Sequence, residues 1–259
     1  MKAILTIAGS DCSGGAGIQA DIKTITAHKM YAMSAITALT AQNTTGVFGI
    51  FEASPDFVAK QIDAVFTDIV PDAVKIGMVS NQEIITVIAE KLKKYEAKNI
   101  VLDPVMISTS GSKLFLDNST ERLIEELMPL ATIITPNLSE AECLAGFAIT
   151  NQADIVRAAM AIGENFCGHI LIKGGHLADR SDDLLYGKGQ EIWFKGERID
   201  TKNTHGTGCT LSSAIACNLA LGKSMEDSVA AAKAYITGAL KAGLKLGHGN
   251  GPLDHCWNL

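Results

Sequence analysis

The sequence has little charge and no excess of positive charge. Of its 259 residues, 19% are charged, and the formal net charge is −6. A chain with this balance has no electrostatic attraction for nucleic acid or for an anionic membrane. Any phosphate that the protein handles must therefore be held by a local arrangement of donors.

Long apolar runs are also missing. The first apolar run, in MKAILTIAGSD, is interrupted by Gly9, Ser10 and Asp11, too early for the core of a signal peptide. The longest uncharged span, 30–51, contains many Ser, Thr, Gln, Asn and Gly residues and would make a poor membrane helix. We therefore expect a cytoplasmic protein. Because 47% of the residues are hydrophobic, we expect one compact domain over residues 1–259.

No two cysteines have the C-x-x-C spacing of redox or zinc sites. The six cysteines are Cys12, Cys143, Cys167, Cys209, Cys217 and Cys256. His205 and Cys209 form at most an isolated pair, which is short of the four ligands of a structural zinc site. We expect reduced thiols and no structural metal site.

Short runs rich in Ile and Val alternate with segments of helical periodicity. The runs are Ala3–Ala8, Ala73–Ile76, Ile100–Leu102, Thr132–Ile134 and His169–Ile172. The helical segments are Pro55–Thr67, Gln82–Tyr95, Ser119–Leu127, Ser139–Leu144 and Ile155–Phe166. This alternation predicts an α/β protein with three α/β/α layers and a mainly parallel central sheet.

The remaining segments depart from this alternation. A hairpin is predicted over Asp183–Tyr186 and Glu191–Phe194, followed by two alanine-rich helices over Thr207–Leu221 and Met225–Lys245. The segment Met30–Glu52 has the pattern of one or two strands. We expect it to form a small β excursion outside the main sheet.

Polar clusters follow five of the predicted strands. These clusters are GSDCSGGAG after the first run, GM after Ile76, DPV after Leu102, TPNLSEAE after Ile134 and KGGH after Ile172. Ligands of open parallel sheets bind beyond the carboxyl ends of the strands. The five clusters are therefore predicted to form one composite site.

Two glycine-rich turns precede predicted helices. GSDCSGGAGIQAD, residues 9–21, contains neither the phosphate-loop nor the dinucleotide-binding pattern, so it is either a tight turn or a place where backbone approaches a ligand. In THGTGCT, Gly206 and Gly208 free backbone N–H groups to turn inward at a helix start, which makes an anion hole. Cys209 then lies in the first helical turn, where the pKa of a thiol is usually lowered. A buried helix start with a small packing cysteine is the alternative.

Three charged residues lie at or shortly after the ends of predicted strands. Asp103 and Glu140 offer the oxygen ligands that suit Mg²⁺, although each could equally be an N-cap or a surface acid. Lys173 is a candidate cation for phosphate, or else an ordinary surface lysine.

Together these motifs resemble the ribokinase-like superfamily, and most closely its hydroxymethylpyrimidine and phosphomethylpyrimidine kinases of thiamine biosynthesis. The resemblance runs through nearly the whole chain. It is carried, in order, by AGSDCSGGAGIQADIKT, TALTAQNTTGV, KIGMV, LDPVM, TPNLSEAE, IKGGH and THGTGCT.

The resemblance implies that ATP, with Mg²⁺, phosphorylates 4-amino-5-hydroxymethyl-2-methylpyrimidine and then its monophosphate, in a protein that is a homodimer. Transferred by motif, the pyrimidine pocket comprises Gly9, Ala16, Asp21, Gln42, Met78 and Val105. Asp103 and Glu140 belong to the magnesium and phosphate region, Lys173 contacts ATP phosphate, and Gly206, Thr207 and Gly208 form the anion hole. The nucleotide base is expected near residues 233–243.

The resemblance also assigns a role to Cys209. Related sugar kinases have an aspartate as general base at this position. The loose transition state of phosphoryl transfer needs alignment more than a strong base, so a cysteine here is chemically acceptable. One departure from the family pattern is Cys12, where a serine is common, and this puts any substrate contact of that side chain in doubt.

Two other functions remain open from the sequence. Some relatives with the same Gly-x-Gly-Cys turn phosphorylate vitamin B6 compounds, so the chain could be a pyridoxal kinase. By the resemblance, Gln42 within AQNTTGV favours the pyrimidine, because it matches the position at which the pyrimidine kinases bind the ring; an amide there can both donate to a ring nitrogen and accept from an amino group. A non-catalytic pyrimidine-binding domain is disfavoured by the presence of Asp103, Glu140 and Lys173.

Overall fold

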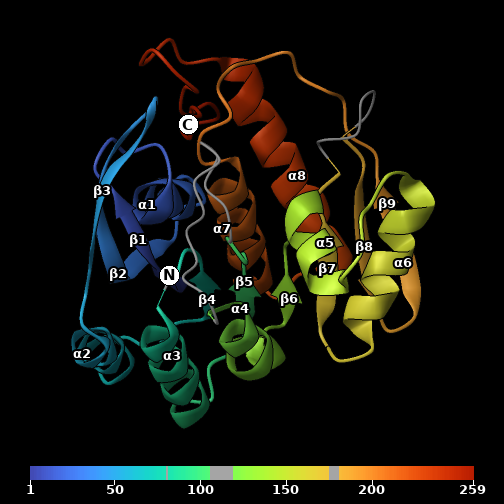
Figure 1. The fold of residues 1–259 in the computed structure, drawn as a ribbon. Coiled ribbons are helices and arrows are strands. Elements are labelled where there is room, and N and C mark those ends of the chain that lie inside the picture. Colours follow the sequence, from blue (N-terminus) through green and yellow to red (C-terminus); the bar gives the residue numbers. More distant parts are fainter. Residues whose placement is uncertain (80, 106–118, 175–180) are drawn as a thin grey trace.

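The computed structural model describes residues 1–79, 81–105, 119–174 and 181–259, and the ends of two quoted motifs, Met106 and His176, lie outside them (Figure 1). Within these ranges, nine strands form one sheet in the order β3-β2-β1-β4-β5-β6-β7-β8-β9. They are β1 (Ala3–Asp11), β2 (Tyr31–Asn43), β3 (Gly46–Glu52), β4 (Ala73–Ile76), β5 (Ile100–Leu102), β6 (Ile133–Ile134), β7 (His169–Ile172), β8 (Asp183–Gly187) and β9 (Gln190–Phe194). Pairing is parallel from β2 to β7, and β3, β8 and β9 are antiparallel to their neighbours.

Helices cover both faces of this sheet (Figure 1). They are α1 (Gly17–Ala27), α2 (Pro55–Phe66), α3 (Gln82–Lys94), α4 (Ser119–Arg122), α5 (Leu138–Ala145), α6 (Gln152–Gly163), α7 (Thr207–Ala220) and α8 (Met225–Ala242). Because successive strand residues point to opposite faces, Leu5 packs in one core cluster with α2, α3 and α6, and Ile4 in another with α7 and α8. The predicted three-layer fold with a mainly parallel sheet is confirmed.

The predicted helix over 119–127 is less regular than expected. Only its first turn, α4, is α-helical, and it continues as a π-helical turn (Leu123–Leu127) and a 3₁₀ turn (Met128–Leu130). Pro129 cannot donate the backbone hydrogen bond that a longer α-helix requires.

The segment 30–52 forms two strands, but they belong to the main sheet. β2 pairs in parallel with β1 from Ala3 opposite Tyr31 to Asp11 opposite Thr40, and β3 closes the edge as an antiparallel neighbour. The expected separation from the sheet is therefore wrong. Met33 and Ala35 are buried in the core between the polar residues of β2, and this burial holds the strand in the sheet.

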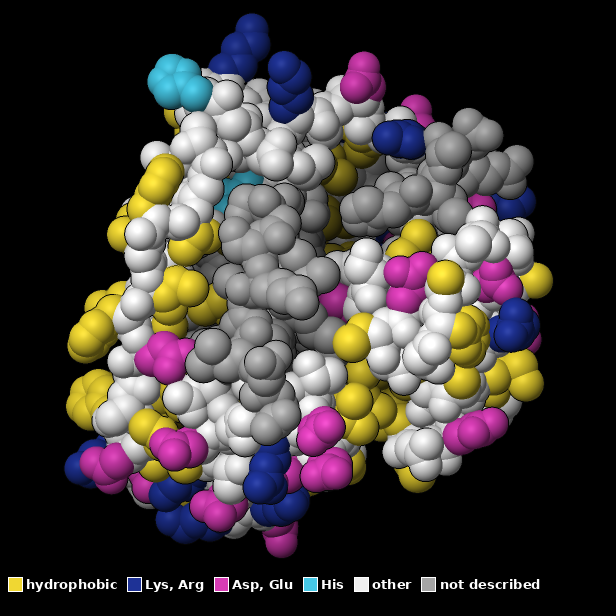
Figure 2. Space-filling model, viewed as in Figure 1, with side chains coloured by type: hydrophobic (Ala, Val, Ile, Leu, Met, Phe, Trp, Pro, Cys, Tyr) yellow, Lys and Arg dark blue, Asp and Glu magenta, His cyan; other side chains and the backbone are white. Residues whose placement is uncertain are grey.

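Apolar side chains are exposed on the β2–β3 edge and on the nearby start of α2 (Figure 2). Leu39 and Phe51 lie opposite each other across the two strands and are 51% and 73% exposed. Phe48 and Phe57 are exposed in the same region. Within the described residues, no helix is both long and apolar enough to cross a membrane.

Candidate active site

A cavity of about 680 Å³ lies where the parallel strands end. All of the predicted site residues except Asp21 line it: Gly9, Ala16, Gln42, Met78, Asp103, Val105, Glu140, Lys173, Gly206, Thr207, Gly208 and Cys209. These residues come from the end of β1, from the loops that follow β1, β4, β5 and β7, from β2, and from the starts of α5 and α7. The fold thus brings the separate motifs together as the strand-end rule predicts.

The two glycine-rich turns are in direct contact. Gly206 has φ +84°, a left-handed conformation that favours glycine, and a Cβ there would lie only 2.0 Å from the carbonyl oxygen of Gly15. Helix α7 begins at Thr207 and carries no charged residue. Its first N–H groups have no partner within the helix and give this end of the cavity a positive potential.

Gly208 faces an ion pair at the wall of the cavity. Lys173 Nζ lies 2.9 Å from Asp103 Oδ1, and Thr135 Oγ1 donates to the same oxygen at 3.1 Å. A Cβ at Gly208 would lie 3.1 Å from Asp103 Oδ2 and 3.5 Å from Lys173 Nζ. Burial lowers the pKa of Lys173, but the carboxylates of Asp103 and Glu140 outweigh it and raise that pKa, so the lysine stays charged.

Glu140 combines a structural role with a place in the cavity. It is the third residue of α5 and forms a capping box with Asn137, in which Asn137 N–H donates to Glu140 Oε2 at 2.8 Å and Glu140 N–H to Asn137 Oδ1 at 2.9 Å. Its carboxylate is therefore buried and oriented at the helix N-terminus. The N-cap of α5 is therefore Asn137 rather than Glu140, and Glu140 is the N3 partner of the capping box that also lines the cavity.

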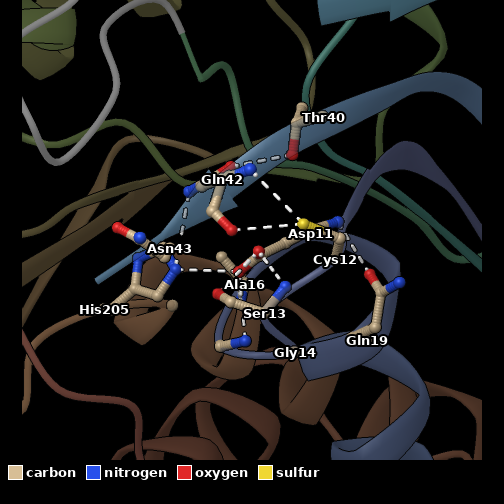
Figure 3. Close-up of polar contacts among 12 residues, drawn as sticks. Asp11, Cys12, Ser13, Gly14, Ala16, Gln19, Thr40, Gln42, Asn43 and His205 are labelled. Atoms are coloured by element: carbon tan, nitrogen blue, oxygen red, sulfur yellow. Dashed lines mark hydrogen bonds and ion pairs between the residues drawn. The ribbon is translucent and has the colours of Figure 1, made fainter. Parts of the chain in front are cut away.

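The other end of the cavity is organised by Asp11 and His205 (Figure 3). Asp11 Oδ2 accepts hydrogen bonds from the N–H groups of Gly15 and Ala16 and lies 2.8 Å from His205 Nε2. Burial raises the pKa of Asp11, but the bonds from His205, Ser13 and Ala16 outweigh it and lower that pKa to about 2. Asp11 is thus a carboxylate that ties the first glycine-rich turn to the second.

Gln42 lies beside this pair, near Thr40 (Figure 3). Gln42 Nε2 is 3.5 Å from His205 Nε2, and its backbone N–H and C=O both contact Cys12 Sγ. Cys12 therefore meets the backbone of β2, which explains how a thiol is accepted where serine is common. Sequence reasoning did not identify Asp11, Thr40 or His205, because Asp11 and His205 are 194 positions apart and no spacing connects them.

Comparison with known proteins identifies the family. A family model described as phosphomethylpyrimidine kinase matches residues 11–254. The chain belongs to the phosphomethylpyrimidine kinase family. It is 48% identical over 255 residues to a hydroxymethylpyrimidine/phosphomethylpyrimidine kinase of Rhizobium meliloti, covering 97% of this chain and 96% of the relative. The family predicted from the motifs is confirmed, and with it a kinase function.

Solved structures of similar proteins include two kinds of kinase. A phosphomethylpyrimidine kinase of Clostridium difficile is 50% identical, with a TM-score of 0.82 over 92% of this chain and 98% of that one. A pyridoxal kinase of Staphylococcus aureus, solved with AMP-PCP and pyridoxal, is 36% identical, with a TM-score of 0.91 over 100% of this chain and 94% of that one. Phosphomethylpyrimidine kinases and pyridoxal kinases thus share this fold.

Cys209 lies in the cavity of this phosphomethylpyrimidine kinase family member, but its acidity differs from expectation. Burial raises the pKa of the Cys209 thiol to about 11, although the nearby Lys75 ammonium acts in the opposite direction. The predicted lowering is wrong, because desolvation of the thiolate outweighs the helix N-terminus. At neutral pH the side chain is a thiol.

Asp21 is the one predicted site residue that does not line the cavity. It is fully buried, and its carboxylate accepts from Thr6 Oγ1 at 2.6 Å, Lys75 Nζ at 2.9 Å and Ser213 Oγ at 2.8 Å. Ser213 is one helical turn beyond Cys209 on α7. Asp21 therefore joins β1, β4 and α7 beneath the site, and its oxygens are engaged by the protein itself, so the prediction that it contacts substrate is corrected.

Helix α8 contributes another part of the cavity wall. Lys233, Ile236, Thr237 and Leu240 line it, within the range 233–243 in which the nucleotide base was expected. Lys233 Nζ lies 2.6 Å from Asp183 Oδ2 and donates to the carbonyl of Ser181. This part of the cavity is therefore bordered by the apolar side chains of Ile236 and Leu240 and by the Lys233–Asp183 ion pair.

Proposed function

We propose that the protein uses ATP to phosphorylate 4-amino-5-hydroxymethyl-2-methylpyrimidine on its hydroxymethyl oxygen, and then phosphorylates the monophosphate to the diphosphate for thiamine biosynthesis. The observation that carries the proposal is one cavity with Gln42 near one end, the Lys173–Asp103 pair farther along, and the glycine turn of α7 between them. Relatives at 42–48% identity that bear this name support it.

In this proposal the pyrimidine binds at the end of the cavity that contains Gln42, Asp11 and His205. Gln42 offers an amide donor and acceptor to the polar edge of the ring, while Met78 and Val105 offer apolar contacts to its faces. Gly9 leaves the room that this needs, since a Cβ there would lie 2.6 Å from Met78 Cε. Ala16 adds a small wall from the start of α1.

The phosphates lie between the α7 turn and Lys173. Backbone N–H groups around Gly206, Thr207 and Gly208 stabilise charge on the transferring phosphoryl group, and Lys173 neutralises ATP phosphate. This arrangement supplies locally the positive potential that a chain of net charge −6 lacks globally.

Mg²⁺ fits the donors of this region. Asp103 and Glu140 supply carboxylates at the cavity wall, and no group of three or more His, Cys, Asp or Glu residues forms a complete cage within the described part of the chain. That donor set suits Mg²⁺, which is commonly held by one or two carboxylates together with water and phosphate. Bound there, the ion would neutralise charge on the phosphates.

Cys209 stands where the attacking hydroxyl loses its proton. With a pKa of about 11, only about one molecule in 10⁴ carries the thiolate at pH 7. Alignment of the hydroxyl by the cavity then contributes more to the rate of phosphoryl transfer than proton acceptance by Cys209 does.

A pyridoxal kinase activity is the second candidate, because the Staphylococcus aureus structures share the fold at a TM-score of 0.91. The two functions separate in one experiment. The protein is incubated with ATP, Mg²⁺ and equal amounts of both alcohols, and the products are followed by mass spectrometry. We expect the pyrimidine monophosphate, followed by the diphosphate, to form before pyridoxal is phosphorylated. Faster phosphorylation of pyridoxal would reverse the assignment, and no transfer to either would refute a kinase of these alcohols.

A homodimer through the exposed β2–β3 face is part of the proposal. β3 is an edge strand, and Phe48 and Phe51 on it are 71% and 73% exposed, which is unusual for an edge that faces water. In analytical ultracentrifugation we expect a dimer, and a monomer for Phe48→Glu/Phe51→Glu. Met160→Glu, which changes an exposed apolar residue on α6, is the control expected to remain dimeric. A monomeric wild type contradicts the proposal.

A further inference from the structure

The Gln42 side chain is held between two polar neighbours (Figure 3). Its Oε1 lies 3.1 Å from Thr40 Oγ1, and its Nε2 lies 3.5 Å from His205 Nε2. These neighbours determine whether the Gln42 oxygen faces Thr40 or His205. They therefore also decide in which order the amide presents an acceptor and a donor to a ligand.

Asp11 determines which hydrogen His205 carries. Asp11 accepts from the N–H groups of Gly15, Ala16 and Ser13, so it is an ionised acceptor, and its Oδ2 is 2.8 Å from His205 Nε2. Nε2 must therefore carry a hydrogen and donate it to Asp11. An Nε2–H group cannot accept from an amide NH₂, so His205 favours the oxygen of Gln42 as its neighbour rather than the nitrogen.

Thr40 leads to the same orientation through its single hydrogen. Thr40 Oγ1 is 3.0 Å from the carbonyl oxygen of Ser10 and 3.1 Å from Gln42 Oε1, and it can donate to only one of them. If the Gln42 amide is turned so that Nε2 and Oε1 exchange places, Nε2 faces Thr40 and Oε1 faces His205. Thr40 then donates to the Ser10 carbonyl and accepts from Gln42 Nε2. Both contacts of the Thr40 hydroxyl are then satisfied, whereas otherwise one of the two oxygens receives no hydrogen from Thr40.

We propose that Asp11, His205 and Thr40 lock the Gln42 amide with Oε1 toward His205 and Nε2 toward Thr40, and that this lock determines the choice between aminopyrimidine and pyridoxal. The inference rests on the proposed function, in which Gln42 reads the ring. His205 and Thr40 are positioning residues, since they act through Gln42.

The lock discriminates because the two alcohols differ next to the reacting group. Beside the carbon that bears the hydroxymethyl group, the pyrimidine has an amino group, a donor, and then a ring nitrogen, an acceptor. At the corresponding positions pyridoxal has an aldehyde, which only accepts, and then a ring hydroxyl. A fixed amide matches one of these orders, whereas an amide that rotates freely accommodates both.

The first test is Thr40→Val, which keeps the shape of the side chain and removes the hydroxyl. We expect the ratio of kcat/KM for the aminopyrimidine alcohol to kcat/KM for pyridoxal to fall about tenfold, the equivalent of one hydrogen bond. Thr24→Val is the matched control. It removes a buried hydroxyl that donates to the Ala20 carbonyl on α1, outside the cavity, and is expected to leave the ratio unchanged.

The second test uses two substitutions of His205. His205→Gln retains an N–H group that can reach Asp11 and is expected to keep most of the wild-type ratio of kcat/KM values. His205→Met has no donor and is expected to lower that ratio. For any variant without turnover, calorimetric Kd values for both alcohols give the ratio of binding affinities instead, which the lock is expected to shift in the same direction. An unchanged ratio in both Thr40→Val and His205→Met overturns the lock. A wild type that does not phosphorylate the aminopyrimidine overturns the proposed function instead, so the two failures are distinguishable.

Discussion

Lys173 Nζ and Asp103 Oδ1 are 2.9 Å apart although their residues are 70 positions apart in the chain. The pair joins the ends of β5 and β7 at the wall of the cavity. Its carboxylate is almost completely buried, and the lysine is the only member that can reach toward an anionic ligand.

Replacing this lysine should therefore impair phosphoryl transfer. For Lys173→Met we expect kcat to fall about 10²- to 10³-fold, the usual effect of removing one donor to transition-state charge. Steady-state kinetics with ATP measures this, and circular dichroism confirms folding. Lys60→Met, which removes an exposed lysine paired with Asp56, is expected to keep kcat. A kcat of wild-type size for Lys173→Met contradicts the phosphate role.

Cys209, which is partly buried, and Cys217, which is fully buried, are two free thiols on the same helix α7. Both have raised pKa values, about 11 and about 12, but only Cys209 lines the cavity. Cys209→Ala is expected to keep the Kd of the pyrimidine and to lose most of kcat, whereas Cys217→Ala keeps both. Turnover of Cys209→Ala at the wild-type rate shows that alignment alone suffices.

The pH dependence of kcat tests the proton role of Cys209. Because its pKa is raised from 9.0 to about 11, the thiolate fraction grows about tenfold per pH unit below 11. If chemistry limits the rate, kcat of the wild type should rise with pH between 7 and 9.5, and that of Cys209→Ala should stay level. Equal slopes for the two proteins exclude Cys209 as the proton acceptor.

Gln42 should control affinity more than rate. Gln42→Ala removes the amide that we propose binds the ring and is expected to raise the KM for the pyrimidine about 10- to 100-fold with a small change in kcat. Asn43→Ala, which changes the neighbouring amide of the β2–β3 turn, is the control. Initial rates over a range of pyrimidine concentrations give both parameters. An unchanged KM removes Gln42 from the binding site.

The buried pair of Asp21 and Lys75 should matter for stability. Asp21→Asn leaves Lys75 without its charge partner in a fully buried place, and we expect the free energy of unfolding to fall by about 3–5 kcal/mol. Urea unfolding measures this. Asp56→Asn, which breaks an exposed pair on α2, should cost less than about 1 kcal/mol. A small effect of Asp21→Asn would show that the Thr6 and Ser213 hydroxyls compensate.

The local patterns of the sequence were sufficient for the layers of the fold and for most of the cavity wall. A strand that ends in Gly, Asp or Lys places that residue at a known edge of a parallel sheet, so Asp103, Lys173 and the glycine turn could be assigned without coordinates. The position of segment 30–52 could not, because its mixture of polar and apolar residues is compatible with a strand inside or outside the sheet.

The tertiary structure alone decided what surrounds each side chain. Asp21 follows a glycine-rich turn as a ligand contact would, but the packing of α1 against β1 and α7 directs it to Lys75 and Ser213. Cys209 begins a helix, yet burial outweighs the helix N-terminus and raises the pKa of its thiol. Asp11 meets His205 across 194 positions. Secondary structure and strand-end chemistry follow from residues close in sequence, whereas burial and hydrogen-bond partners arise from contacts between distant segments, which only the folded chain creates.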